Sequence, residues 1–144
     1  MKKLGVYLVA AAVVFGLGAA VSAQKAKKHR VVIDVTMAGP DAWGPVLNGI
    51  ENVQKAFGAE NVEIEAVAHE KGLGMVVKAS DPGLVERMQR IAATGVVFAA
   101  CENSMRHQHV SKSDLFSFDI TVDSGAAELI RKQEAGWAYI KAGQ

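Results

Sequence analysis

The stretch GVVFAACENSM, residues 95–105, joins an apolar run to a short polar segment and contains Cys101, the only cysteine of the chain. The run at 96–101 has no charged residue, which is typical of a strand buried on both faces of a parallel sheet. The four residues that follow it resemble the first turn of a helix. The stretch therefore predicts a buried strand that passes directly into a helical turn, with the cysteine at the junction.

Strands and helices alternate on both sides of this stretch. Predicted strands cover residues 30–36, 62–69, 96–101, 116–123 and 137–141. The predicted helices between them begin and end at recognisable signals, namely Pro45 and Gly58, Asp81-Pro82 and Gly95, and Ser124 and Gly136. Such alternation favours parallel pairing through right-handed crossovers. The predicted fold class is α/β, a three-layer α/β/α sandwich with a mainly parallel sheet of about five strands.

The first 23 residues have the three regions of a secretory signal peptide. Lys2 and Lys3 precede the apolar run 4–20, and Val21-Ser22-Ala23 fits the small-x-small cleavage pattern. An uncleaved membrane anchor is the alternative, since the apolar run is almost long enough to span a bilayer. Three glycines in the run and the cleavage pattern favour removal. We expect a signal peptide at 1–23, a single domain at 24–144, and a periplasmic or secreted protein that is not membrane-bound after cleavage.

Composition excludes several functional classes. Cleavage after residue 23 would leave 121 residues, enough for one domain, with 14 basic and 15 acidic side chains. A nearly neutral chain without a clustered basic surface does not indicate nucleic-acid binding. The sequence has no G-x-G-x-x-G, Walker A or G-x-S-x-G motif, so nucleotide binding and serine hydrolysis lack their usual signals. We expect no cofactor.

Cys101 is the first candidate for chemistry. It is predicted at the carboxyl end of a strand, where parallel sheets bind their ligands. Free N–H groups of the following turn would stabilise a thiolate and lower the thiol pKa from about 8.5 towards neutrality, although the adjacent Glu102 opposes this. An unpaired thiol in an oxidising compartment is either buried or used. The residues alone leave both alternatives open.

Three further residues are candidates for a binding role beside this thiol. His69 ends the second predicted strand, where it is either a surface histidine or an imidazolium that pairs with the thiolate. Asn103 and Ser104 can donate hydrogen bonds to a bound anion, but they are equally common as helix caps. The candidate site therefore consists of Cys101 as catalytic residue and of His69, Asn103 and Ser104 as binding residues.

Three potential metal ligands, Met105, His107 and His109, follow Cys101 closely. A set of one cysteine, one methionine and two histidines would suit soft copper. The two histidines are predicted to lie in a loop, and no second cysteine is present. We therefore expect no metal site.

Four segments resemble a known family. They are VLNGIENV, VEIEAVAHEKGLGMV, GVVFAACENSM and SGAAELIRKQEAGWAYIK, spread over residues 30–141. Through them the chain is similar to the DsrE/DsrF-like proteins, a group that includes sulfur-relay subunits related to TusD. The resemblance implies an α/β/α domain, often assembled as trimers or hexamers. It also implies that Cys101 matches the cysteine on which sulfur-relay members carry sulfur as a persulfide.

Two functional hypotheses follow. In the first, the protein is an exported sulfur carrier or sulfurtransferase-like protein, with a persulfide on Cys101 and a partner that donates or accepts sulfur. In the second, it is a non-catalytic oligomeric module whose strand-end cleft binds a small ligand. Both include a homo-oligomer, which the apolar Trp137, Tyr139 and Ile140 of the short last strand also favour.

Overall fold

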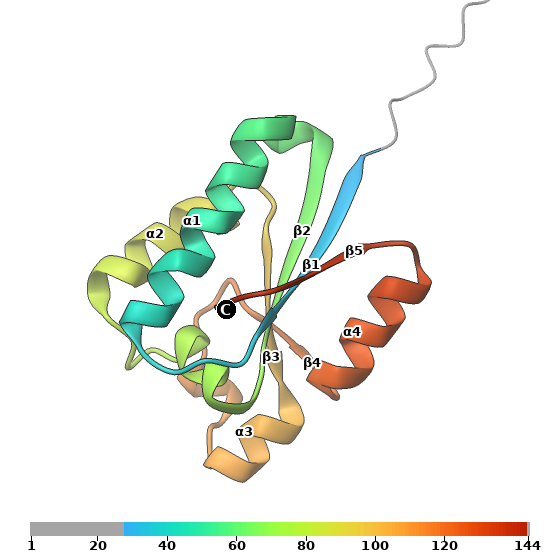
Figure 1. The fold of residues 1–144 in the computed structure, drawn as a ribbon. Coiled ribbons are helices and arrows are strands. Elements are labelled where there is room, and N and C mark those ends of the chain that lie inside the picture. The colour runs from blue at the N-terminus through green and yellow to red at the C-terminus, as the bar shows by residue number, and fades with distance from the viewer. Residues whose placement is uncertain (1–27, 144) are drawn as a thin grey trace, which may run out of the picture.

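A five-stranded sheet forms the centre of the molecule, and all its strands are parallel (Figure 1). The computed structural model describes residues 28–143. The strand order is β4-β3-β2-β1-β5. The strands are β1 (His29–Val35), β2 (Val62–Ala68), β3 (Val97–Cys101), β4 (Ile120–Val122) and β5 (Ala138–Lys141). The prediction of a mainly parallel sheet of about five strands is therefore confirmed.

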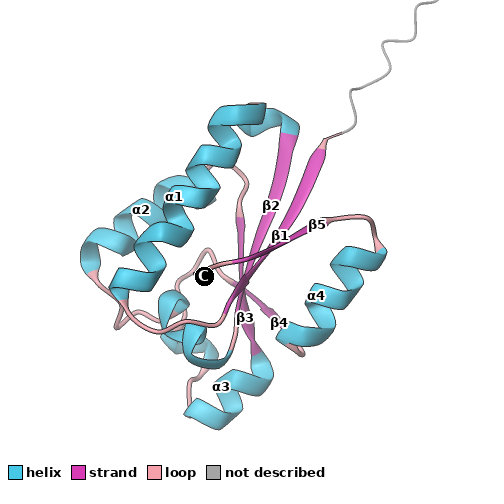
Figure 2. Ribbon diagram, viewed as in Figure 1, coloured by secondary structure: helices cyan, strands magenta, loops and turns pink. Residues whose placement is uncertain are grey.

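Helices cover both faces of this sheet (Figure 2). The α-helices are α1 (Pro40–Phe57), α2 (Pro82–Ala92), α3 (Glu102–Gln108) and α4 (Gly125–Glu134). Three short 3₁₀ segments, η1 (Ala59–Asn61), η2 (Glu70–Val76) and η3 (Lys112–Asp114), lie in the connections. Helices α1 and α2 lie side by side on one face, and α4 lies on the other. This arrangement confirms the three-layer α/β/α sandwich.

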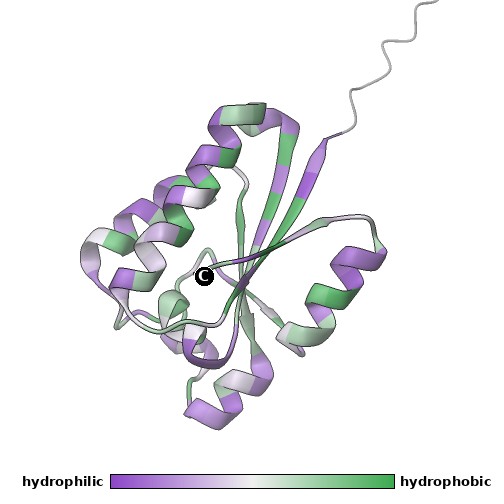
Figure 3. Ribbon diagram, viewed as in Figure 1, coloured by the Kyte–Doolittle hydropathy of each residue, from purple (hydrophilic) through white to green (hydrophobic). Residues whose placement is uncertain are grey.

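The two faces of the sheet are buried very differently. Most of the apolar core lies between the sheet and α1 and α2, where Leu47, Met88 and Phe98 are fully buried. The cluster under α4 is small and consists of Val32, Val67, Ala99 and Leu129. Each long helix accordingly carries hydrophobic and hydrophilic residues together (Figure 3). The layer on the α4 side is therefore thin.

The buried charges lie on the α4 side as well. Asp34 and Glu65 are the buried carboxylates among residues 28–143. Glu65 pairs with Lys132 of α4, and burial raises the pKa of its carboxyl group despite that partner. This ion pair ties α4 to β2 where apolar contact is limited.

Several predicted caps are confirmed, because they depend on neighbours in sequence. Asp81 accepts the Leu84 N–H at the start of α2, and Ser124 accepts the Ala127 N–H at the start of α4. Gly95 and Gly136 follow helices with positive φ angles of 95° and 81°. Only glycine adopts such angles readily.

Two predicted boundaries and one predicted loop were wrong. Helix α1 begins at Pro40, so Pro45 lies inside the helix and not in its first turn. The added turn is held by Trp43, which is buried and donates its indole N–H to the Met37 carbonyl at 2.7 Å. Strand β4 is shorter than predicted, because Asp119 accepts the Phe116 N–H and closes a turn before it.

The predicted loop after Cys101 is in part helical. His107 lies in α3, and His109 is its C-cap in the left-handed conformation, with φ of 55°. Both histidines are exposed.

The segment after β2 folds tightly over the end of β1. The His69 N–H donates to the Val35 carbonyl at 3.1 Å, and the Gly72 N–H donates to the His69 carbonyl at 2.9 Å. A Cβ at Gly72 would lie 2.0 Å from the Val35 oxygen, so a side chain there has no room. His69 is thereby fixed at the carboxyl end of the sheet.

The predicted signal peptide lies outside the described residues. Within 28–143, none of the helices has the length and apolar character that crossing a bilayer would need.

Candidate functional site

Cys101 ends β3 and is at the same time the N-cap of α3. Its Sγ accepts the Ser104 N–H of α3 at 3.5 Å and the Gly125 N–H of α4 at 3.1 Å. The beginnings of two helices thus meet at one sulfur atom. The predicted helical turn after the strand is confirmed, and the second donor comes from 24 residues further along the chain.

These donors change the acidity of the thiol. Burial alone raises the pKa of Cys101, but hydrogen bonds from the Ser104 backbone and hydroxyl and from the Gly125 and Asn103 N–H groups outweigh it. The pKa of Cys101 is therefore lowered from its ordinary value. Hydrogen bonds to the ionised form favour that form. The site stabilises a sulfur anion with neutral backbone donors.

The thiol is buried in the protomer. Only 3% of the Cys101 residue surface is exposed, and the Gly125 amide lies directly against the sulfur. A reactant larger than a few atoms therefore reaches Sγ only after the start of α4, which covers the sulfur, has moved locally.

Ser104 and Asn103 both follow the cysteine, but their side chains have different contacts. The Ser104 hydroxyl is buried and accepts the Glu70 N–H at 2.8 Å, which fixes η2 against α3. The Asn103 side chain is exposed and accepts a hydrogen bond from Arg106. Asn103 therefore acts on Cys101 through its backbone, whereas Ser104 does so through both backbone and hydroxyl.

Glu102 has its own partners. Its carboxylate accepts the Thr121 hydroxyl at 2.9 Å and pairs with Lys112 at 3.2 Å. The Thr121 hydroxyl and Lys112 lower the pKa of this carboxyl group, so it is ionised at neutral pH. The positive charge of Lys112 partly offsets this negative charge, so Glu102 raises the pKa of the neighbouring thiol less than an unpaired carboxylate would.

His69 lies beside Cys101 at the ends of adjacent strands. Ala68 of β2 is aligned with Ala100 of β3, so the next residues of both strands are neighbours. The His69 side chain also packs against Gly125, where an added Cβ would lie 2.8 Å from the His69 Cβ and Cγ. The structure thus brings the predicted residues His69, Ser104 and Cys101 to one edge of the sheet.

The His69 ring is turned towards β1. Its Nε2 lies 2.7 Å from Oδ1 of Asp34, whose Oδ2 accepts the Tyr139 hydroxyl at 2.7 Å. The contact with Asp34 raises the pKa of the Tyr139 phenol. A row of hydrogen-bonded side chains thus runs across β5, β1 and β2 to the neighbour of Cys101.

Sequence reasoning missed three members of this site. Asp34 is the one charged residue inside the apolar run VVIDV, and that irregularity was the available signal. Tyr139 was interpreted as part of an apolar surface, but its hydroxyl is bound to Asp34. Gly125 was not considered, because nothing local in the sequence connects it with Cys101.

The four potential copper ligands, Cys101, Met105, His107 and His109, do not surround one point. Met105 is buried in the main core, while His107 and His109 are exposed. Within residues 28–143, the structure groups no three His, Cys, Asp or Glu side chains in a way that could hold a metal ion.

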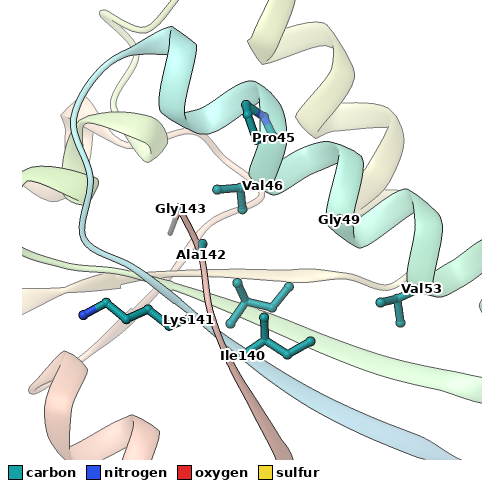
Figure 4. A pocket seen from close by; sticks show the side chains of 9 residues that line it. Pro45, Val46, Gly49, Val53, Ile140, Lys141, Ala142 and Gly143 are labelled. Carbon is teal, nitrogen blue, oxygen red and sulfur yellow. The ribbon is translucent and has the colours of Figure 1, made fainter.

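An apolar pocket of about 240 Å³ lies on the other side of the sheet (Figure 4). It lies between α1 and β5, and Val46, Val53 and Ile140 are among its lining residues. Cys101 and His69 do not line it. The candidate site and this pocket are therefore separate features.

Family comparison agrees with the fold and with the four segments quoted above. The DsrE/DsrF-like family matches residues 21–142. The chain belongs to the DsrE/DsrF-like family. No curated protein matches it.

Solved structures share the fold. A protein of unknown function, MTH1491 from Methanobacterium thermoautotrophicum, is similar at 27% identity with a TM-score of 0.74, covering 79% of this chain and 99% of that one. The ychN protein from E. coli matches at 11% identity and a TM-score of 0.60, covering 80% and 98%. BT1422, a conserved protein of unknown function from Bacteroides thetaiotaomicron, matches at 15% identity and a TM-score of 0.59, covering 78% of this chain and 93% of that one. The last two support the fold alone.

The hydrogen bonds to Cys101 predict how the thiol titrates. In the folded protein its pKa should lie below that of the same thiol in urea, which serves as an internal reference because the chain has a single cysteine. Ser104→Ala removes the hydroxyl contribution and should raise the folded pKa, whereas Ser117→Ala, in an exposed turn, should leave it unchanged. Thiolate absorbance against pH measures all three.

The same titration has a consequence for stability. Because the folded pKa lies below the unfolded one, the thiolate favours folding above the unfolded pKa, and this contribution is lost as the pH falls through the folded value. A folded pKa equal to the urea value would contradict the prediction.

Proposed function

We propose that this protein is a sulfur carrier or sulfurtransferase-like protein that holds sulfane sulfur as a persulfide on Cys101. The observation that carries the proposal is the pair of N–H groups, from Ser104 and Gly125, directed at Sγ. Membership of the DsrE/DsrF-like family supports it, because that family implies a sulfur-relay-related fold. Ser104 and the backbone of Asn103 stabilise the anion, and His69 assists from the adjacent strand.

The proposed loading step is a thiol exchange without net oxidation. The Cys101 thiolate attacks the outer sulfur of a donor persulfide, polysulfide or thiosulfate, and a new S–S bond forms at Sγ. The S–S bond of the donor breaks, and its remaining part leaves with the electron pair: as a thiolate from a persulfide, as a shorter polysulfide or hydrosulfide from polysulfide, and as sulfite from thiosulfate. Release to a partner thiol is the same exchange in the opposite direction. A lowered thiol pKa raises the thiolate fraction available for attack.

A second candidate function rests on the burial of Cys101. A thiol with 3% exposure is also compatible with a non-catalytic oligomeric module that binds a small ligand at the strand ends. The two functions differ in whether sulfur becomes covalently attached to Cys101.

The carrier function predicts that Cys101 takes up sulfur and keeps it. After incubation with thiosulfate or inorganic polysulfide and removal of the excess, the intact mass should rise by one sulfur atom, and reductant should reverse the gain. Cys101→Ser should show no gain. A matched control, Cys101→Ser with Ser117→Cys, moves the thiol to an exposed turn without these donors, and it should retain far less sulfur. If native protein never loads, or if the moved thiol loads equally well, the carrier function is wrong and the binding module remains.

We also propose that the protein is exported and that residues 1–23 are removed as a signal peptide. The support is the arrangement of basic, apolar and small residues described above. N-terminal sequencing of protein recovered from the periplasm or the medium should return a chain that begins at Gln24. An intact Met1 on that protein would favour the anchor.

We propose, finally, a homo-oligomer, a trimer or hexamer. Strand β5 is an exposed edge of the sheet, and Tyr139 and Ile140 are each 42% exposed on it. Bare apolar edges are sites of association. Light scattering at micromolar concentration should give a multiple of the protomer mass, and a monomer mass would contradict this proposal.

A further inference from the structure

We propose that Asp34 and His69 are positioning residues that hold the N-terminus of α4 against the sulfur of Cys101. The inference deepens the proposed function, since it concerns the same thiol, but it rests on contacts that exist whether or not sulfur is carried. It assigns a role to Asp34, a buried carboxylate that is not needed for the exchange chemistry.

The first step of the argument is the contact between His69 and Gly125. Gly125 begins α4, and an added Cβ there would lie 2.8 Å from both Cβ and Cγ of His69 and 3.2 Å from Cδ2. The glycine backbone therefore rests directly on the histidine side chain. Because the Gly125 N–H also reaches Sγ at 3.1 Å, the position of the His69 ring determines how close this donor comes to the sulfur.

The second step is what fixes the ring. Its Nε2 donates to Oδ1 of Asp34 at 2.7 Å, because a carboxylate oxygen only accepts, and the other oxygen accepts the Tyr139 hydroxyl. Asp34 is 6% exposed, and β1 is paired on both sides, so the carboxylate belongs to the rigid part of the sheet. Buried charged hydrogen bonds of this kind hold side chains in one orientation.

The third step separates positioning from simple charge. A carboxylate near a thiol disfavours the thiolate, so removal of Asp34 as a mere charge would lower the thiol pKa. If Asp34 instead positions the Gly125 donor through His69, its removal weakens a hydrogen bond to the thiolate, and the thiol pKa rises. The two roles predict shifts of opposite sign. Glu102, the acid that follows Cys101 in the chain, is present in every variant and does not affect the comparison.

The experiment measures thiolate absorbance against pH in the full chain, and for each protein the same protein with Cys101→Ser added is subtracted to remove the tyrosine signal. Asp34→Ala should shift the Cys101 midpoint upward. Asp34→Asn, whose amide oxygen still accepts the His69 N–H, should retain most of the lowered value. Ser117→Ala, in an exposed turn, serves as the control and should leave the midpoint unchanged. At a fixed pH below the midpoint, alkylation of Asp34→Ala should be several-fold slower than that of Asp34→Asn.

Other outcomes overturn the proposal. A downward shift in Asp34→Ala means that Asp34 acts only as a charge. Equal upward shifts in the Ala and Asn variants mean that an imidazolium at His69, and not its position, favours the thiolate. Should Asp34→Ala fail to fold, His69→Ala removes the surface under Gly125 and must raise the midpoint, whereas His69→Gln, which keeps Cβ and Cγ without an imidazolium, must raise it less. Sulfur loading of the native protein is scored separately, so failure to load refutes the proposed function and leaves this result standing.

Discussion

The hydrogen bond from the Gly125 N–H to the Cys101 sulfur is the contact on which the site depends. It joins the end of β3 to the start of α4, which is 24 residues further along the chain. Without this donor and those of α3, Cys101 would be a buried thiol at a strand end, and burial would raise its pKa. With these donors, the site favours the thiolate through neutral hydrogen-bond donors and not through a nearby cation. Backbone dipoles do this at no cost in reorganisation, because the fold has already oriented them.

Helix α4 is held on the sheet by few contacts. Its buried apolar contacts are made by Leu129 against Val32, Val67 and Ala99 of the sheet, and an ion pair between Lys132 and Glu65 holds its other end. A helix held mainly by a few polar contacts opens locally at lower free energy than the main core. The N-terminus of α4 both donates to Sγ and covers it, so access to Sγ and part of the lowering of the thiol pKa depend on one structural element.

Much of the fold could be predicted from the sequence, because its signals are local. Continuous apolar strands indicated the parallel sheet, and Asp81 and Ser124 marked helix starts through bonds to residues three positions away. The start of α1 could not be placed, because Pro45 lies inside the helix and Trp43, which holds the first turn, packs against Gly74, a residue distant in sequence. The position of Cys101 at a helix start was predictable for the same local reason. The Gly125 donor and the link between Asp34 and His69 depend on strand order and register, which no single segment encodes.

The side chains and amides around the thiol come from nearly the whole length of the domain. Asp34 and Tyr139, which share a hydrogen bond, are 105 positions apart in the chain, and β1, β2, β3 and α4 each contribute one part. The Ser104 and Asn103 donors lie within three positions of Cys101, whereas the fold brings in the Gly125 donor and the His69 side chain against which Gly125 packs. Non-local contacts of this kind form late, when the sheet closes. A nascent or unfolded chain therefore lacks the Gly125 donor, and the pKa of Cys101 reaches its folded value only once α4 has packed onto the sheet.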